Sequence, residues 1–117
     1  MRDHSKLLAF RLADHVALSI YRTTRDFPNS ELFGLTSQMR RASVSVASNI
    51  VEGCARSSEA DYLRFLDMAY GSARELEYQV TLAHRLDYID SGSFQTLYEA
   101  CQEVSKVLSG LIRSLRE

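Results

Sequence analysis

Between residues 62 and 83, apolar side chains recur at alternating steps of four and three without a gap. The series is Tyr62, Leu66, Ala69, Ala73, Leu76, Val80 and Ala83. This spacing lines up one face of an α-helix, and a sustained heptad-like period favours lengthwise packing against other helices. Ser58 and Asp61 match a capping box, in which the serine oxygen accepts a backbone amide at the helix start. The pattern predicts one helix of about thirty residues, or about 45 Å.

Three other segments have a helical period. Residues 5–25 contain Ala9, Ala13, Val16 and Ile20, residues 31–52 contain Leu35, Met39, Ala42 and Val46, and residues 94–115 contain Phe94, Leu97, Cys101, Val104, Leu108, Leu111 and Leu115. Breaks are predicted at Pro28, at Gly53 as a left-handed helix stop, and before Ser93 as an N-cap. Four long helices with short loops predict an all-α fold, an antiparallel up-and-down four-helix bundle that forms one domain over residues 1–117.

The composition suits one folded core. A chain of 117 residues with 45% hydrophobic and 25% charged residues is not typical of disordered proteins. Cys54 and Cys101 are far apart and form no CxxC pattern, so free thiols in a reducing compartment are expected. We find no signal-peptide pattern, and no apolar run approaches the roughly 18 residues of a membrane span. The sequence therefore predicts a soluble cytoplasmic protein with no membrane partner.

Charge is distributed unevenly along the chain. The net charge is −1, but residues 1–57 carry eight Lys/Arg and five Asp/Glu, whereas residues 58–90 carry three and seven. A mildly basic first half and an acidic third segment suit either contacts between subunits or a local basic face.

Small residues gather in two of the predicted helices, beginning with the stretch QMRRASVSVASNIVEG at residues 38–53. The residues expected to permit close helix packing are Ala42, Gly53, Ala69, Gly71 and Ala73. A glycine inside a helix costs about 1 kcal/mol relative to alanine, so Gly71 needs a packing reason. The sequence predicts that the second and third helices approach each other closely.

Polar side chains fall near the same approach. They are Gln38, Ser45, Asn49, Glu52, Ser72 and Glu75. An unpaired buried polar group costs roughly 1–3 kcal/mol, so we expect these groups to form a structural hydrogen-bonded network that fixes the register of the two helices. The alternative is a ligand or metal site built from Glu52 and Glu75.

The same stretches carry a family resemblance. LTSQMRRASVSVASNIVEGCAR, DYLRFLDMAYGSARELEYQV and LDYI occur in order, with Gln38, Arg40–Arg41, Ser45, Asn49–Ile50, Glu52–Gly53, Gly71–Ser72 and Glu75 as their characteristic parts. The chain resembles the bacterial four-helix-bundle family that includes proteins encoded in intervening sequences of 23S ribosomal RNA genes. The resemblance implies a homopentamer around a central channel, and no established enzymatic activity. A related branch, the accessory proteins of diversity-generating retroelements, binds nucleic acid and a reverse transcriptase but is strongly basic, which this chain is not.

Motifs for catalysis are missing from the sequence. Neither His15 nor His84 follows a glutamate at the Glu-x-x-His spacing of di-iron bundles, and HExxH, phosphate-loop and nucleophile-elbow motifs do not occur. Cys54 has no His or Asn at a recognisable catalytic spacing. The sequence predicts a non-enzyme without cofactor or metal.

A basic face is the leading candidate site. The arginines assigned to nucleic-acid binding are Arg40, Arg41, Arg56, Arg22 and Arg25. In an oligomer, repeated phosphate contacts would add up to salt-dependent affinity for RNA or an RNA-bound protein. Without a base-reading motif, binding would follow charge or shape. Alternatively, Arg40 and Arg41 form salt bridges across a subunit interface to the acidic third helix.

A protein-only interaction scaffold is the second functional hypothesis. Tyrosines are enriched in interfaces, and Tyr62, Tyr70, Tyr78 and Tyr88 are either exposed anchors or core residues. The sequence thus predicts a non-catalytic homo-oligomer, with RNA or a nucleic-acid-bound protein as the first candidate partner and another protein as the second.

Overall fold

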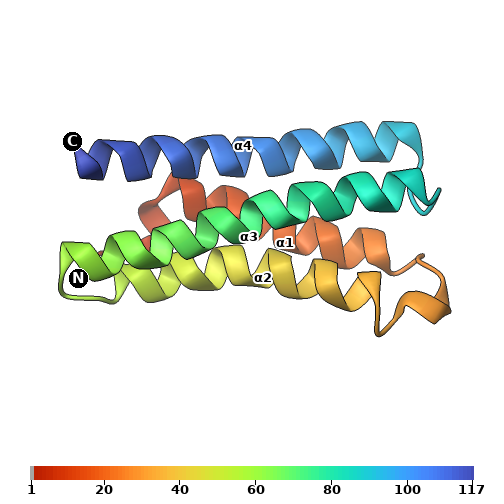
Figure 1. The fold of residues 1–117 in the computed structure, drawn as a ribbon, viewed down its shortest axis with the longest axis horizontal. Coiled ribbons are helices and arrows are strands. Elements are labelled where there is room, and N and C mark those ends of the chain that lie inside the picture. Colours follow the sequence, from red (N-terminus) through yellow and green to blue (C-terminus); the bar gives the residue numbers. More distant parts are fainter. Residues whose placement is uncertain (1) are drawn as a thin grey trace.

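The four periodic segments form four α-helices in the computed structural model, which describes residues 2–117. The α-helices are α1 (Leu8–Thr24), α2 (Leu35–Cys54), α3 (Glu59–Arg85) and α4 (Ser91–Arg116), with short 3₁₀ turns at His4–Lys6 and Asn29–Glu31 (Figure 1). The described part of the chain contains no strand. The bundle measures 43 × 24 × 19 Å. The all-α, four-helix prediction is confirmed.

Each helix packs against two neighbours. α2 contacts α1 and α3, and α4 contacts α3 and α1, so the α2–α3 seam and the α1–α4 seam lie on opposite sides of the bundle. The chain turns back at each connection (Figure 1). Along the α3–α4 seam, Asp67 pairs with Arg116 while Glu77 bonds to Ser105, so residue numbers rise along one helix as they fall along the other.

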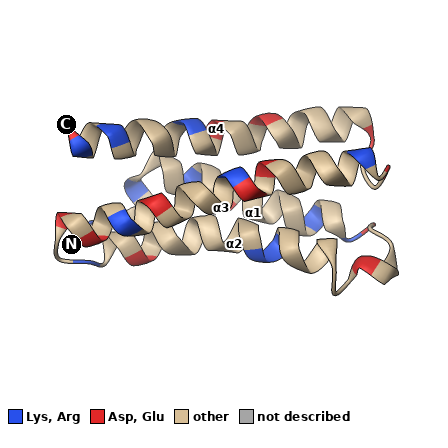
Figure 2. Cartoon of the chain, in the orientation of Figure 1, with Lys and Arg blue, Asp and Glu red and all other residues tan. Residues whose placement is uncertain are grey.

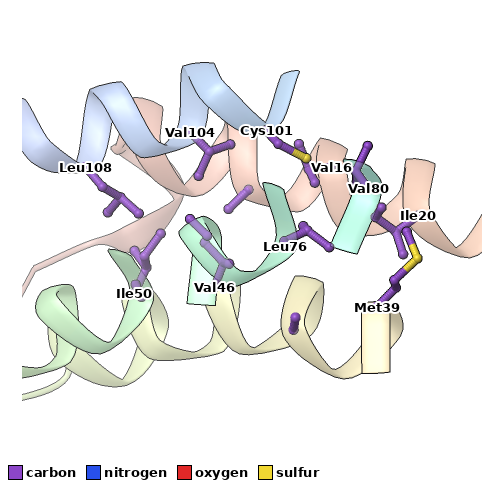
Figure 3. Close-up of a cluster of buried hydrophobic side chains, with 14 of the residues drawn as sticks. Val16, Ile20, Met39, Val46, Ile50, Leu76, Val80, Cys101, Val104 and Leu108 are labelled. Carbon is purple, nitrogen blue, oxygen red and sulfur yellow. The ribbon is translucent and has the colours of Figure 1, made fainter. Parts of the chain in front are cut away.

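The predicted apolar stripes form the core. The largest side chains that are at most 2% exposed include Ile20 from α1, Met39 from α2, Leu76 from α3 and Leu108 from α4 (Figure 3). Burial of such a side chain contributes roughly 1.5–3 kcal/mol. Because every helix supplies a continuous stripe, the core runs along the whole bundle.

Three of the predicted helix starts differ from the structure, and the first of them is α1, which begins at Leu8 rather than at Ser5. Ser58 caps α3 as expected, its Oγ accepting the amide of Asp61 at 3.1 Å. α4, however, is capped by Asp90 rather than Ser93, because the Asp90 carboxylate accepts the Ser93 amide at 2.7 Å. α2 begins at Leu35 and not near Glu31, since the Glu31 carboxylate accepts the Leu35 amide at 3.1 Å.

Gly53 is not a left-handed helix stop. It lies inside α2, and among residues 2–117 the only positive φ belongs to Asp87, at 62°. A Cβ added at Gly53 would lie 3.0 Å from Phe65 Cβ and 3.2 Å from Tyr62 Cδ1. Close packing against α3 therefore explains this glycine, which agrees with the packing role predicted for it and corrects the predicted stop.

None of the helices within residues 2–117 is both long enough and apolar enough to span a membrane.

Candidate nucleic-acid interface and the α2–α3 seam

Three of the five candidate arginines gather where α1 ends and α2 begins. The Nε of Arg40 donates to Thr24 Oγ1 at 2.9 Å, and its guanidinium lies 4.9 Å from the centroid of the Tyr21 ring. Arg22 and Arg25 flank Thr24 on the chain and are exposed. The side chain of Arg40 is thus held against α1, near the end of that helix that carries the exposed Arg22 and Arg25.

The other two candidate arginines lie elsewhere. Arg41 faces a cleft between α2 and α3. Arg56 follows the far end of α2, sixteen residues or about 24 Å along the helix from Arg40. It stacks over Phe65 at 4.6 Å and approaches Glu52 at 4.0 Å. The five arginines therefore do not form one continuous face on a single copy of the chain. Lys and Arg residues as a whole are spread over all four helices (Figure 2).

The arginines also differ in their ion pairs. Arg56 joins Arg2, Arg64, Arg74 and Arg116 in forming salt bridges within the chain. Within the described residues, Arg22, Arg25, Arg40 and Arg41 form none. Their charges are available to a ligand or to another molecule.

Only some of the polar residues predicted at the α2–α3 seam form hydrogen bonds with one another. Ser45 Oγ and Ser72 Oγ lie 2.9 Å apart, and Asn49 Nδ2 donates to Ser45 Oγ at 3.0 Å and to the Ser45 carbonyl at 2.8 Å. Glu75 accepts from Gln79 Nε2 at a longer 3.4 Å. Gln38 lines the cleft beside Arg41. The serine–asparagine cluster ties the two helices together in one register.

Gln79 is a seam residue that the sequence reasoning missed. It is 3% exposed, and its Oε1 has no hydrogen-bond partner among residues 2–117. The signal was present, because Gln79 lies seven residues after Ser72 and so on the same stripe of α3.

Glu52 and Glu75 do not form a shared site. With Ser45 opposite Ser72, the two glutamates lie about 15 Å apart along the seam at 1.5 Å per residue. No group of three or more His, Cys, Asp or Glu side chains in the described chain is arranged to hold a metal ion. The alternative of a joint ligand or metal site is therefore wrong for this pair.

Gly71 contradicts the close-packing prediction. Ala42, Ala69 and Ala73 are at most 5% exposed between the helices, as the small-residue pattern predicted. Gly71 is exposed on the outside of α3, and a Cβ built there meets nothing within 4 Å. Among residues 2–117, nothing requires a glycine at this position.

The tyrosines divide between core and surface. Tyr62 is 2% exposed and belongs to the core, whereas Tyr78 is 60% exposed. Tyr70 accepts a hydrogen bond from Arg74, and Tyr88 donates to Glu31 at 2.7 Å. Only Tyr78 is free to act as a protruding anchor among these four.

The two cysteines are poor nucleophiles. Burial, with the nearby Glu77 carboxylate, raises the pKa of Cys101 to about 12. Burial also raises the pKa of Cys54. Because the thiolate is the reactive form, neither position suits nucleophilic catalysis at neutral pH.

The matches between this chain and known proteins include the residues that form these sites. The family model for the 23S rRNA-intervening sequence protein matches residues 5–110. The chain is also similar to the crystal structure of a protein with unknown function from the S23 ribosomal protein family of Bacteroides thetaiotaomicron VPI-5482. The TM-score is 0.84 at 25% sequence identity, over 91% of this chain and 96% of that one. No curated protein matches the chain.

Proposed function

Because the chain belongs to the 23S rRNA-intervening sequence protein family, and the similar crystal structure is of a protein with unknown function, we propose a non-catalytic, architectural role. The chain acts as an antiparallel up-and-down four-helix bundle that assembles with further copies of itself into a ring in the cytoplasm. Five copies are the number that the family resemblance favours.

The outer stripe of α3 carries this proposal. We define it as Met68, Gly71, Glu75 and Tyr78, which recur at steps of three, four and three. Met68 is 41% exposed and Tyr78 60% exposed, on either side of the open Gly71. A glycine inside a helix costs about 1 kcal/mol relative to alanine, and nothing in the described chain offsets that cost. A helix of a second copy, packed at Gly71, would offset it and bury both apolar side chains.

Charge complementarity supports a second copy as the occupant. Arg41 and Glu75 line the same α2–α3 cleft, yet neither forms a salt bridge among residues 2–117. An arginine of one copy can pair with the glutamate of the next, as expected if the arginine bridges to the acidic third helix across an interface. Opposite charges on one surface suit repeated contact between identical chains.

The mass of the assembly tests this proposal. Native mass spectrometry should show several copies for the natural chain and mainly single copies for Gly71→Leu, because leucine would block the approach of the neighbouring helix. Circular dichroism should show unchanged helix content, since Gly71 is exposed and a Cβ added there meets nothing within 4 Å.

Gly110→Leu is the matched control. Gly110 is also inside a helix, on α4, and a Cβ added there meets nothing within 4 Å. The Gly110→Leu variant should form an assembly with the same number of copies as the natural chain. A natural chain that is monomeric, or a Gly71→Leu variant that keeps the full mass, would refute assembly through the outer stripe.

RNA binding is a second candidate function, supported by the unpaired arginines at the α1–α2 end. Arg40 is hydrogen-bonded to Thr24, and Arg22 and Arg25 lie on either side of Thr24 in the chain, so the three arginines lie at the same end of the bundle. In an assembly this cluster is repeated in every copy, so weak contacts add up. The affinity should fall steeply with salt, because each phosphate contact releases counterions.

A salt series with labelled structured RNA tests this function. The double variant Arg25→Gln/Arg40→Gln should bind more weakly and reduce the slope of log affinity against log salt by about 0.7 for each phosphate that an arginine no longer neutralises. Arg56→Gln/Arg64→Gln is the control, because both arginines already have carboxylate partners. If the natural chain does not bind RNA at low salt, the protein-only scaffold becomes the remaining function.

A further inference from the structure

A second cleft lies on the α1–α4 seam, on the opposite side of the bundle from the α2–α3 seam. Its volume is about 440 Å³, within the range of roughly 300–1,000 Å³ that is usual for small-molecule sites. Side chains that line it and bear on ligand binding are His15, Ser19, Arg22 and Thr23 from α1, with Thr96 and Leu97 from α4. The packing of the core and the proposed assembly do not use these α1 residues, and only Arg22 is shared with the proposed RNA contact.

The α1 side of the cleft is a row of hydrogen-bond donors. His15, Ser19, Arg22 and Thr23 lie at i, i+4, i+7 and i+8, which places them on one face of the helix. His15 and Arg22 are exposed, and Ser19 and Thr23 are half-buried. In the described part of the chain, the hydroxyls of Ser19 and Thr23 have no hydrogen-bond partner, and Arg22 has no salt bridge. Four side chains can therefore donate into the cleft.

The charge of this cleft distinguishes it from others on the molecule. No Asp or Glu lines it. By contrast, Glu77, Glu99 and Glu103 line the cleft between α3 and α4, and Glu75 lines the α2–α3 cleft. An anion would meet a carboxylate in those two places but only cationic or neutral groups here.

The nearby acid on α4 is already engaged. The Asp90 carboxylate accepts the amide of Ser93 at 2.7 Å and its hydroxyl at 3.2 Å. These hydrogen bonds hold the pKa of Asp90 below its usual value. The amino-terminal end of α4 is thus capped by its own aspartate, and the donors available to a ligand come from α1.

We propose that this cleft binds a phosphate group. Arg22 presents the planar fork that binds phosphate oxygens in pairs, His15 supplies a ring N–H, and Ser19 and Thr23 supply hydroxyl donors. Leu97, 5% exposed, forms an apolar wall against which a sugar or base rests. The phosphate comes either from a free nucleotide-sized ligand or from an RNA backbone.

Calorimetric titration of the full chain separates these sources. One arm uses inorganic phosphate and a nucleoside monophosphate, each matched by sodium chloride at equal ionic strength, and the other arm uses structured RNA. For a free ligand we expect one saturable site per chain, with affinity reduced about tenfold or more by Arg22→Gln, because glutamine cannot replace the charge-assisted bidentate hydrogen bonds of arginine. Ser19→Ala/Thr23→Ala should weaken binding severalfold.

Arg11→Gln is the matched control, because Arg11 is another exposed arginine of α1 that lies outside the cleft and takes part in none of the proposed contacts. It should change phosphate affinity less than twofold. If only RNA binds, and Arg22→Gln weakens RNA binding more than Arg11→Gln does, the phosphate belongs to the RNA backbone. If Arg22→Gln and Arg11→Gln have equal effects on every ligand, or if no ligand binds, the phosphate site is refuted. The Gly71→Leu variant should keep the site, so failed assembly and a failed phosphate site give different results.

Discussion

Gly53 and Gly71 both lie within long helices, between small or polar residues, yet their surroundings differ. A Cβ at Gly53 would press against Phe65 at 3.0 Å and Tyr62 at 3.2 Å, whereas a Cβ at Gly71 would meet nothing within 4 Å. Gly53 is buried in the α2–α3 seam and Gly71 faces outward on α3. One glycine is required by a neighbour in the same chain, and the other has no such requirement.

The same contrast separates the two sides of α3 as a whole. Its inner side is closed by packed apolar groups and by the hydrogen bond between Ser45 and Ser72. Its outer stripe carries exposed Met68 and Tyr78. The difference shows that a small residue in a helix does not always mark a contact inside the protomer. For Gly71, the proposed assembly supplies another explanation.

The largest expected effect concerns thiol reactivity in the interior. Cys101 is 2% exposed, and its pKa of about 12 lies well above the ordinary 9.0. At pH 8 the thiolate fraction should therefore be about a thousandfold below that of the unfolded chain, and labelling should be slowed at least that much. Mass spectrometry of iodoacetamide-labelled peptides, with and without urea, measures the ratio. Rapid labelling of Cys101 in the folded chain would show that the interior is not closed.

The raised pKa of Cys101 also makes the stability of the fold depend on pH. Since the unfolded thiol releases its proton near pH 9 and the folded thiol does so only near pH 12, the unfolded state binds fewer protons between these values. The free energy of unfolding should therefore fall as the pH rises above 9. A Cys101→Ala variant should lose this part of the fall, which urea unfolding at pH 8 and pH 10 can detect.

The two glycines should respond to alanine in opposite directions. Gly53→Ala should destabilise the chain by about 1–2 kcal/mol, because overpacking against Phe65 Cβ exceeds the gain in helix propensity. Gly71→Ala should raise the free energy of unfolding of the single copy by up to about 1 kcal/mol, since alanine is the better helix former and the space is open. Urea unfolding measures both.

Protein concentration must be controlled in this comparison, because assembly adds to apparent stability. Measurements at the lowest usable concentration isolate the single copy. If Gly53→Ala were neutral there, the α2–α3 contact at Phe65 would be looser than the structure indicates. If Gly71→Ala were destabilising there, Gly71 would have a neighbour within the protomer.

Much of the fold followed from the sequence because each helix has an unbroken apolar period. The capping box at Ser58 placed the start of α3, and the family resemblance is confirmed by the family model. The helix ends were less predictable, because several side chains compete to cap the same amides. Asp90 precedes Ser93 and takes its amide, which residue type alone does not decide.

The candidate site was less predictable than the fold. The sequence identified Ser45, Asn49 and Ser72 as one network, because heptad spacing determines which residues share a helix face. It grouped Arg56 with Arg40 although α2 carries them to opposite ends. Whether two side chains share a surface depends on their distance along the helix and on their direction around it, and residue types alone give neither. Whether a small residue faces inward depends on its position around the helix. Ser72 faces the α2–α3 seam, and Gly71, one residue earlier, faces outward because one residue turns the helix by about 100°.

The smallest expected effect compares two serines of α2. Ser45 Oγ bonds to Ser72 and accepts from Asn49, whereas Ser48 is exposed and has no side-chain hydrogen bond within residues 2–117. Ser45→Ala should lower the free energy of unfolding by about 0.5–1 kcal/mol, since two part-buried partners lose a hydrogen bond. Ser48→Ala should raise it slightly, by up to about 0.5 kcal/mol, through helix propensity alone. Urea unfolding of both variants and of the natural chain shows whether each substitution raises or lowers the free energy of unfolding. Equal values for the two variants would mean that the seam hydrogen bonds contribute no more than solvent does, and that apolar packing alone distinguishes the inner side of α3 from its outer stripe.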